Sequence, residues 1–141
     1  MPVRKASATW NGTLRQGDGS FESQSGAIGG KYSFGTRFEE SPGTNPEELL
    51  AAAEASCFSM ALAGNVEKAG HTPERIETSA RCTLEKSDAG FTITTMALST
   101  TVTAPGLEQA ELDELAQQTK QTCTVSRALA GDEISVEAKL G

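Results

Sequence analysis

The fold is decided by residues 45–64, which read NPEELLAAAEASCFSMALAG. Alanine and leucine are the best helix formers, the interior has no proline, and apolar side chains cover nearly the whole circumference, which is typical of a helix enclosed by its own protein. Asn45 fits the N-cap, Pro46 the first helical position and Glu48 the third position of a capping box. The stretch therefore predicts a central core helix over residues 45–70.

One apolar stripe along this helix contains a cysteine. Its members recur at three- and four-residue steps and are Leu50, Ala53, Cys57, Met60, Ala61 and Gly64. A free cysteine is among the residues most often buried and usually behaves as a small hydrophobe. The helix alone therefore favours a packing role for the thiol.

The rest of the chain reads as strands and one further helical region. The order of elements predicts a single α+β domain over residues 1–141, in which a sheet covers one side of two long helices. The expected segments besides the central helix are N-terminal strands within 1–40, a strand pair over 75–103, a second helical region over 107–130 and a last strand over 133–140.

The expected strand over residues 31–38 contains Arg37, a candidate site residue. Aromatic residues and Thr36 alternate there with Ser33, Gly35 and Arg37. Side chains on a strand point alternately to opposite faces, so the alternation predicts that Arg37 points away from the aromatic side.

Three further expectations concern local features. The apolar phase of the return strand shifts between Ile93 and Met96, which suggests a bulge or burial on both faces. Cys82 falls on the inward face of its alternating strand, so it is expected to be a core residue. Thr124 or Ser126 is expected to cap a last short helical turn.

Composition indicates a soluble globular protein. The 141 residues are 37% hydrophobic and 22% charged, and the net charge of −7 disfavours nucleic acids and anionic membranes as partners. No signal-peptide core is evident, and the longest apolar run, which carries Glu54, is expected to be too short to span a bilayer. Three widely separated cysteines do not make a secreted disulfide framework, so a cytoplasmic location is expected.

No cofactor or metal is expected, because the cysteines and the lone histidine lack ligand spacing and no glycine-rich loop fits phosphate. Hydrolysis through Cys57 lacks a general base, since His71 lies at a helix terminus where a C-terminal cation is the simpler interpretation. Thiol chemistry remains. A reactive Cys57 needs a nearby cation, for which Arg37 is the candidate.

Four segments together resemble a known family. They are TRF at 36–38, GTNPEELLAAA at 43–53, SCFSMAL at 56–62, and Cys123 followed by Val125 and Ser126. The chain is identified by them as a member of the OsmC (osmotically inducible protein C) group of the OsmC/Ohr family, and the likeness runs from the Trp10 region to the last strand.

The resemblance implies a fold, an activity and a set of site residues. The fold is one of antiparallel sheets wrapped around two long helices in an intertwined homodimer with two active sites. The activity is thiol-dependent reduction of organic hydroperoxides and, less well, hydrogen peroxide, with dithiols such as protein-bound dihydrolipoyl groups as reductants. Cys57 matches the peroxidatic cysteine, Cys123 the resolving cysteine, Arg37 the activating arginine and Glu47 the carboxylate that holds it.

Two residues depart from the family's pattern. Glu54 stands where many relatives carry histidine, and Thr124 where they usually carry proline. A carboxylate one helical turn before Cys57 would raise the pKa of the thiol if it pointed at the sulfur.

The function expected from these observations is peroxide reduction in oxidative or osmotic stress defence, through a Cys57 sulfenic acid and a Cys57–Cys123 disulfide. The alternative is a dimeric stress protein in which both cysteines are packing residues and an apolar groove stores a hydrophobic ligand. Glu47 lies about 15 Å before Cys57 along one helix axis. An arginine held by Glu47 is therefore expected to serve the cysteine of the partner chain.

Overall fold

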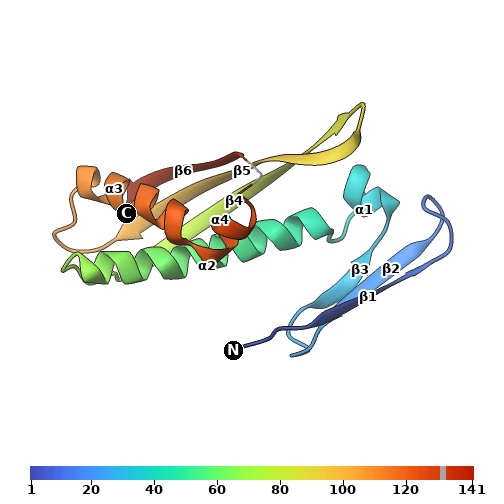
Figure 1. Cartoon of the computed structure of the whole chain (residues 1–141), viewed down its shortest axis with the longest axis horizontal. Helices are drawn as coiled ribbons and strands as arrows, with labels where there is room; N and C mark the ends of the chain where they lie inside the picture. Colours follow the sequence, from blue (N-terminus) through green and yellow to red (C-terminus); the bar gives the residue numbers. More distant parts are fainter. Residues whose placement is uncertain (131–132) are drawn as a thin grey trace. The chain divides into compact units, whose positions relative to one another are not determined.

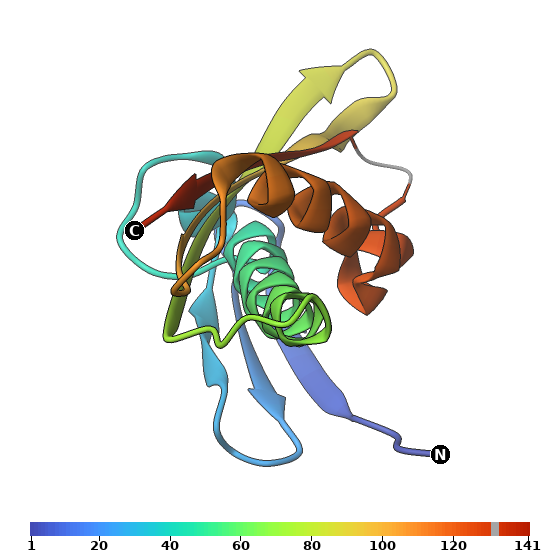
Figure 2. The same ribbon diagram turned by 90° about the vertical axis from the view of Figure 1, so that its left-hand side faces the viewer.

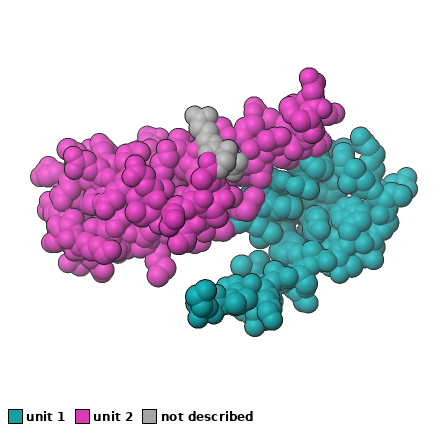
Figure 3. Space-filling view, viewed as in Figure 1, with its two compact units in different colours: residues 1–49 teal, residues 50–141 magenta. Residues whose placement is uncertain are grey.

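The computed structural model describes residues 1–130 and 133–141, which form two compact units, residues 1–49 and residues 50–141 (Figure 3). Its helices and strands confirm the α+β class. In chain order they are β1 (Ala6–Asn11), β2 (Asp18–Ser23), β3 (Gly29–Tyr32), α1 (Phe34–Phe38), α2 (Pro46–Lys68), β4 (Arg75–Ser87), β5 (Gly90–Thr103), α3 (Gln109–Thr122), α4 (Thr124–Ala128) and β6 (Glu133–Leu140) (Figure 1).

The first unit holds an antiparallel sheet in the order β1-β2-β3. Gly12, with φ +92°, follows the last residue of β1 and begins the loop to β2. Gly19 of β2 lies between the rings of Trp10 and Tyr32, and a Cβ atom there would come within 2.6 Å of the tyrosine ring. Glycine is needed at this position because the two rings occupy the space of any side chain.

The strand predicted over 31–38 is wrong beyond Tyr32, because α1 begins at Phe34. Ser33 Oγ accepts a hydrogen bond from the Thr36 N–H, and Thr36 Oγ1 accepts one from the Ser33 N–H, at 3.2 and 2.8 Å. This reciprocal capping box starts a helix at the point where alternation suggested a strand. Arg37 consequently does not avoid the aromatic side, since its guanidinium lies 5.1 Å from the centre of the Phe38 ring.

The second unit holds a sheet in the order β4-β5-β6. β4 and β5 are antiparallel, whereas β6 runs parallel to β5, so the expectation of purely antiparallel sheets is corrected at the last strand. The connection from β5 to β6 contains α3 and α4, and such a crossover is what parallel pairing requires. The predicted bulge is present: Thr83 pairs with Thr95 but Leu84 pairs with Ile93, which leaves Thr94 as the extra residue.

The core of the second unit joins α2, α3 and the sheet, with both helices on the same side of it (Figure 2). Fully burying a large apolar side chain stabilises the fold by about 1.5–3 kcal/mol. The residues of α2 with no exposed surface are Glu54, Phe58, Leu62 and Val66. Phe58, Leu62 and Val66 pack with a group from the other elements whose members are Met96, Leu98, Val102, Leu112, Leu115, Ala116, Cys123 and Ile134.

The buried stripe of α2 differs from the predicted one. Met60 is 81% exposed and Ala53 is exposed, so the expectation of a helix enclosed by its own chain is wrong for this side. The hydrophobic pattern runs around the whole helix, and periodicity alone did not tell which side faces its own sheet.

The length argument against a membrane span is also corrected, because α2 is long and apolar enough to cross a bilayer by length and composition. One side of α2 packs into the core: Phe58, Leu62 and Val66 are fully enclosed by the sheet and α3, and Glu54 has no exposed surface. Over the apolar stretch as a whole, 22% of the residues are buried.

Candidate active site

Two thiols meet in the second unit. Cys57 lies in the middle of α2 and Cys123 lies between α3 and α4, and their Sγ atoms are 3.0 Å apart. Cys123 is buried, whereas Cys57 is partly exposed. A disulfide has an S–S length of about 2.05 Å, so the pair is reduced but needs only a small movement to become bonded.

A break between two helices places Cys123 at this point. Its N–H donates to Thr119 O at 2.8 Å and closes α3, and its carbonyl accepts from the Arg127 N–H at 3.0 Å and opens α4. The ψ angle of 127° at Cys123 is extended, so the chain changes direction between the two helices. The change of direction brings the start of α4 to the sulfur of Cys57.

The pKa values of the two thiols are shifted in opposite directions. Burial raises the pKa of Cys57, but hydrogen bonds from the Cys123 thiol, the Thr124 hydroxyl and the backbone N–H groups of Val125 and Thr124 together lower it below its ordinary value. Burial, followed by the hydrogen bond to Cys57, raises the pKa of Cys123. When the pair loses one proton, the thiolate therefore forms on Cys57 and the proton stays on Cys123.

The start of α4 supplies a residue that sequence reasoning missed. Thr124 Oγ1 lies 3.4 Å from Cys57 Sγ. The expectation that Thr124 or Ser126 caps the last helical turn is wrong, because Cys123 is the N-cap residue and provides no side-chain cap. The one sequence signal for this contact was that Thr124 follows Cys123 directly. That signal was not sufficient, because it does not show that Cys123 lies beside Cys57 in the folded chain.

Glu54 does not serve the thiol in the way its sequence position suggested. Its Oε1 atom accepts a hydrogen bond from the Ser126 hydroxyl, and both side chains are buried. Its Oε2 atom has no hydrogen-bond partner among the described residues. The groups that shift the pKa of Cys57 are the burial of the sulfur and donors in residues 123–125, and Glu54 is not one of them.

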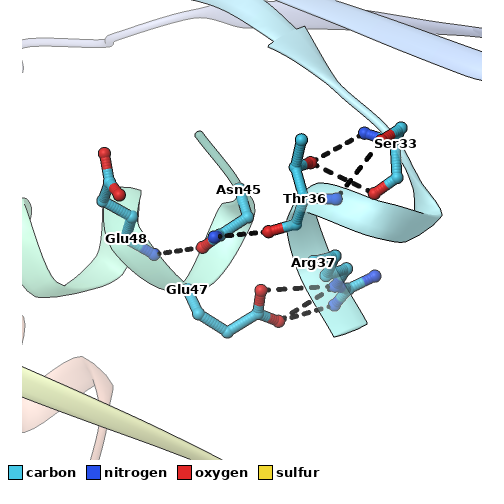
Figure 4. Close-up of polar contacts among 6 residues, drawn as sticks. All are labelled: Ser33, Thr36, Arg37, Asn45, Glu47 and Glu48. Carbon is cyan, nitrogen blue, oxygen red and sulfur yellow. Dashed lines mark hydrogen bonds and ion pairs between the residues drawn. The ribbon is translucent and has the colours of Figure 1, made fainter. Parts of the chain in front are cut away.

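Arg37 and Glu47 form an ion pair in the first unit, as Figure 4 shows. The guanidinium donates from Nε and from a terminal nitrogen to the carboxylate, with N–O distances of 3.0, 3.3 and 2.9 Å. Glu47 is 7% exposed. A bidentate, partly buried pair of this kind fixes the plane of the guanidinium.

The beginning of α2 is fastened to α1 beside this ion pair (Figure 4). Asn45 Oδ1 accepts from the Glu48 N–H at 2.8 Å, as the capping expectation requires, and Asn45 Nδ2 donates to Thr36 O at 2.9 Å. The Glu48 carboxylate accepts from the Thr44 hydroxyl at 3.2 Å and not from the Asn45 N–H, so the N-cap prediction is confirmed and the reciprocal half of the predicted capping box is wrong. The turns that carry Arg37 and Glu47 are therefore linked by the Asn45–Thr36 hydrogen bond in addition to the ion pair.

A cavity of about 430 Å³ lies in the first unit, and Arg37 contributes to its wall. The remaining wall is mostly aromatic, with Trp10, Tyr32, Phe34 and Phe38. An apolar cavity with one fixed cation suits a molecule that has a hydrophobic body and a polar or anionic end.

Other candidate residues take structural places. Cys82 is half-buried on β4 and packs against the core, and His71 Nε2 lies 2.9 Å from a carboxylate oxygen of Glu111. Within residues 1–130 and 133–141, no three His, Cys, Asp or Glu side chains gather as metal ligands would.

A family model described as OsmC-like protein matches residues 38–139. Peroxiredoxin OsmC of Escherichia coli (strain K12) is 44% identical over 138 residues, which cover 97% of this chain and 96% of that protein. The organic hydroperoxide resistance protein of Xanthomonas axonopodis pv. citri (strain 306) is 31% identical over 96 residues, 64% of this chain and 62% of that protein.

Solved structures show the same fold at low identity. An OsmC-like protein from Mycoplasma pneumoniae superposes with a TM-score of 0.75 at 14% identity, covering 99% of this chain and 97% of that one. An organic hydroperoxide resistance protein from Legionella pneumophila gives a TM-score of 0.70 at 22% identity, covering 100% and 99%.

Proposed function

Because the chain belongs to the family of OsmC-like proteins, we propose that it is a thiol-dependent peroxidase that reduces organic hydroperoxides, and hydrogen peroxide more weakly, in oxidative or osmotic stress defence. The observation that carries the proposal is the thiol pair, whose sulfurs lie 3.0 Å apart with oppositely shifted pKa values. The Cys57 sulfur ionises more readily and is the proposed nucleophile, whereas the Cys123 thiol keeps its proton beside it.

The reaction uses these two sulfurs in turn. The Cys57 thiolate attacks the terminal oxygen of the hydroperoxide, the O–O bond breaks, and its electron pair leaves with the alkoxide, which takes a proton and becomes the alcohol. Cys57 is then a sulfenic acid. Cys123 attacks that sulfur, hydroxide leaves as water, and a disulfide forms. An external dithiol, such as a protein-bound dihydrolipoyl group, reduces the disulfide by exchange.

Arg37 has the role of stabilising the leaving alkoxide. Negative charge develops on that oxygen in the transition state, and a guanidinium already fixed by Glu47 stabilises it without reorganising. The aromatic wall beside Arg37 offers apolar surface to the organic group of the substrate. This wall supports a preference for organic hydroperoxides, because hydrogen peroxide has no group to bury there.

The assembly proposed is a homodimer with composite active sites, in the cytoplasm. The side of α2 that its own chain leaves uncovered includes Met60, and a second copy of the chain is the proposed occupant. Arg37 and Glu47 of one chain then act on Cys57 of the other, since Glu47 precedes Cys57 by ten residues in the same helix. The composite arrangement explains how a pair at the helix entrance serves a thiol in the helix middle.

Peroxide consumption tests the proposed activity. We expect the protein to convert cumene hydroperoxide to the alcohol with dithiothreitol as reductant, and N-ethylmaleimide treatment to abolish the conversion because it blocks both thiols. The alternative, a stress protein that stores a hydrophobic ligand in the aromatic cavity, predicts ligand binding with no loss of peroxide. A wild-type rate equal to that of the alkylated protein would overturn the peroxidase.

Disulfide mapping tests the roles of the three cysteines. One equivalent of peroxide is expected to produce a Cys57–Cys123 bridge and to leave Cys82 reduced, because the first two sulfurs already lie 3.0 Å apart. Mass spectrometry of peptides from non-reduced protein reads the outcome. A bridge to Cys82, or no bridge in the wild type under mild oxidant, contradicts the assignment.

A further inference from the structure

We propose that Thr124 is a further catalytic residue, whose hydroxyl donates a hydrogen bond to the Cys57 thiolate and increases the fraction of the sulfur in its attacking form. The inference rests on the proposed function, since it assigns a role within the same reaction. The contact that supports it is the 3.4 Å separation of Thr124 Oγ1 and Cys57 Sγ. Hydrogen bonds to sulfur are longer than those to oxygen, so this distance is a contact between donor and acceptor.

The chemistry of the two groups sets the direction of the hydrogen bond. A thiolate has no proton and only accepts, whereas a threonine hydroxyl has one proton to give. When Cys57 is ionised, Thr124 is therefore the donor. Both its hydroxyl and its backbone N–H lower the pKa of Cys57 as hydrogen-bond donors to the sulfur.

Thr124 differs from the other side-chain donor in an important way. The Cys123 thiol also donates to Cys57, at 3.0 Å, but Cys123 is the group that must lose its proton to resolve the sulfenic acid. A threonine hydroxyl stays protonated throughout the cycle. Thr124 is thus a side-chain donor that the reaction does not consume.

A buried hydrogen bond joins α4, which carries the exposed Thr124 side chain, to α2. Ser126, two residues further along α4, donates to Glu54, which lies one helical turn before Cys57 on α2. Glu54 is 0% exposed and Ser126 is 2% exposed, so water does not compete for this bond. The segment that carries the hydroxyl is therefore tied to the same helix that carries the thiolate.

The threonine at position 124, where relatives usually carry proline, supplies hydrogen-bond donors that a proline lacks. Proline has neither a hydroxyl nor a backbone N–H, so a proline at this position removes both donors that Thr124 directs at Cys57. The backbone accepts the exchange, because Thr124 is the first residue of α4 and Cys123 before it has φ −59° and ψ 127°. Thr124→Pro is consequently expected to remove both donors without changing the backbone conformation at this position.

Three variants test the proposal. Thr124→Val keeps the branched shape and removes the hydroxyl, Thr124→Ser keeps the hydroxyl, and Thr124→Pro removes hydroxyl and N–H together. The measurement is the pH dependence of iodoacetamide alkylation, followed on the Cys57 peptide by mass spectrometry so that the other two cysteines do not contribute. Thermal unfolding checks that each variant is folded.

We expect alkylation of Cys57 at neutral pH to slow roughly tenfold in Thr124→Val, the size of one hydrogen bond to a charged group, with its midpoint moved to higher pH. Thr124→Ser should match the wild type, and Thr124→Pro should be slower than Thr124→Val. An unchanged midpoint in Thr124→Val overturns the proposal, and so does an equal shift in Thr124→Val and Thr124→Ser, which would indicate packing.

The readout separates this inference from the proposed activity. Alkylation needs no peroxide. If the protein consumes no hydroperoxide but the Thr124 variants show the expected alkylation rates, the proposed peroxidase activity is refuted and the hydrogen bond from Thr124 to Cys57 is supported. A protein that consumes hydroperoxide with no dependence on the Thr124 hydroxyl refutes the Thr124 role and leaves the peroxidase.

Discussion

Cys57→Ser abolishes peroxide reduction, and Cys123→Ser keeps the first turnover: this is the expected result of exchanging each thiol in turn. A serine hydroxyl is not ionised at neutral pH, so the Cys57 variant loses its nucleophile and at least about a thousandfold in rate. Cys123→Ser retains the Cys57 sulfur together with the Thr124 and backbone donors around it. It is therefore expected to reduce one equivalent of hydroperoxide per chain and then stop.

The two variants also leave different chemical traces. Without a resolving partner, Cys57 in Cys123→Ser accumulates as sulfenic acid, which dimedone traps, and then proceeds to the irreversible sulfinic acid with excess peroxide. Cys82→Ser is the matched control, because it removes a cysteine that packs against the core on β4. Single-turnover activity that survives in Cys57→Ser and disappears in Cys123→Ser would reverse the two roles.

Complementation between two inactive variants is the second large effect expected. Arg37→Ala loses the charge that stabilises the alkoxide, worth roughly a hundredfold to a thousandfold in rate, and Cys57→Ser loses the nucleophile. When the two variants are unfolded and refolded together, a composite site assembles from the Arg37 of one chain and the Cys57 of the other. Each purified heterodimer should then have about half the activity of the wild-type dimer, since one of its two sites is complete.

A reciprocal mixture provides the control. A chain that carries both substitutions, refolded with the wild type, gives a heterodimer in which each composite site lacks one of its two groups, so it should be inactive. If Arg37 and Cys57 act within one chain, the outcomes exchange: the first heterodimer is inactive and the second keeps one working site. Differently tagged chains allow both heterodimers to be isolated and their composition confirmed.

The sequence predicted those parts of the structure that depend on local patterns. The beginning of α2 follows from Asn45 and Pro46, and the bulge near Thr94 follows from a phase shift along one strand. The helix α1 was missed although its signal is local, because its five residues, Phe34–Phe38, are too short for helical periodicity to outweigh alternation. The local signal was the spacing of Ser33 and Thr36, which form the reciprocal capping hydrogen bonds.

Features that depend on tertiary packing were beyond the sequence. An all-round apolar helix does not show which side its own sheet covers, so the burial of Glu54 and the exposure of Met60 were not foreseen. The same holds for the Thr124 contact, which joins residues that are far apart in the chain. The roles of Cys57 and Cys123 came from family resemblance, whereas their proximity is a result of the fold.

The parallel pairing of β6 with β5 has a consequence for the order of folding. The contact between Thr95 and Glu133 closes a long loop of chain that contains α3, Cys123 and α4. Closing such a long loop has an entropic cost that precedes the gain from its contacts, so we expect this pairing to form late in folding. Cys57 and Cys123 are 66 residues apart in the chain, so their 3.0 Å separation is likewise expected only once the intervening chain has folded back. Disulfide formation at this pair is then expected to report on the completed fold.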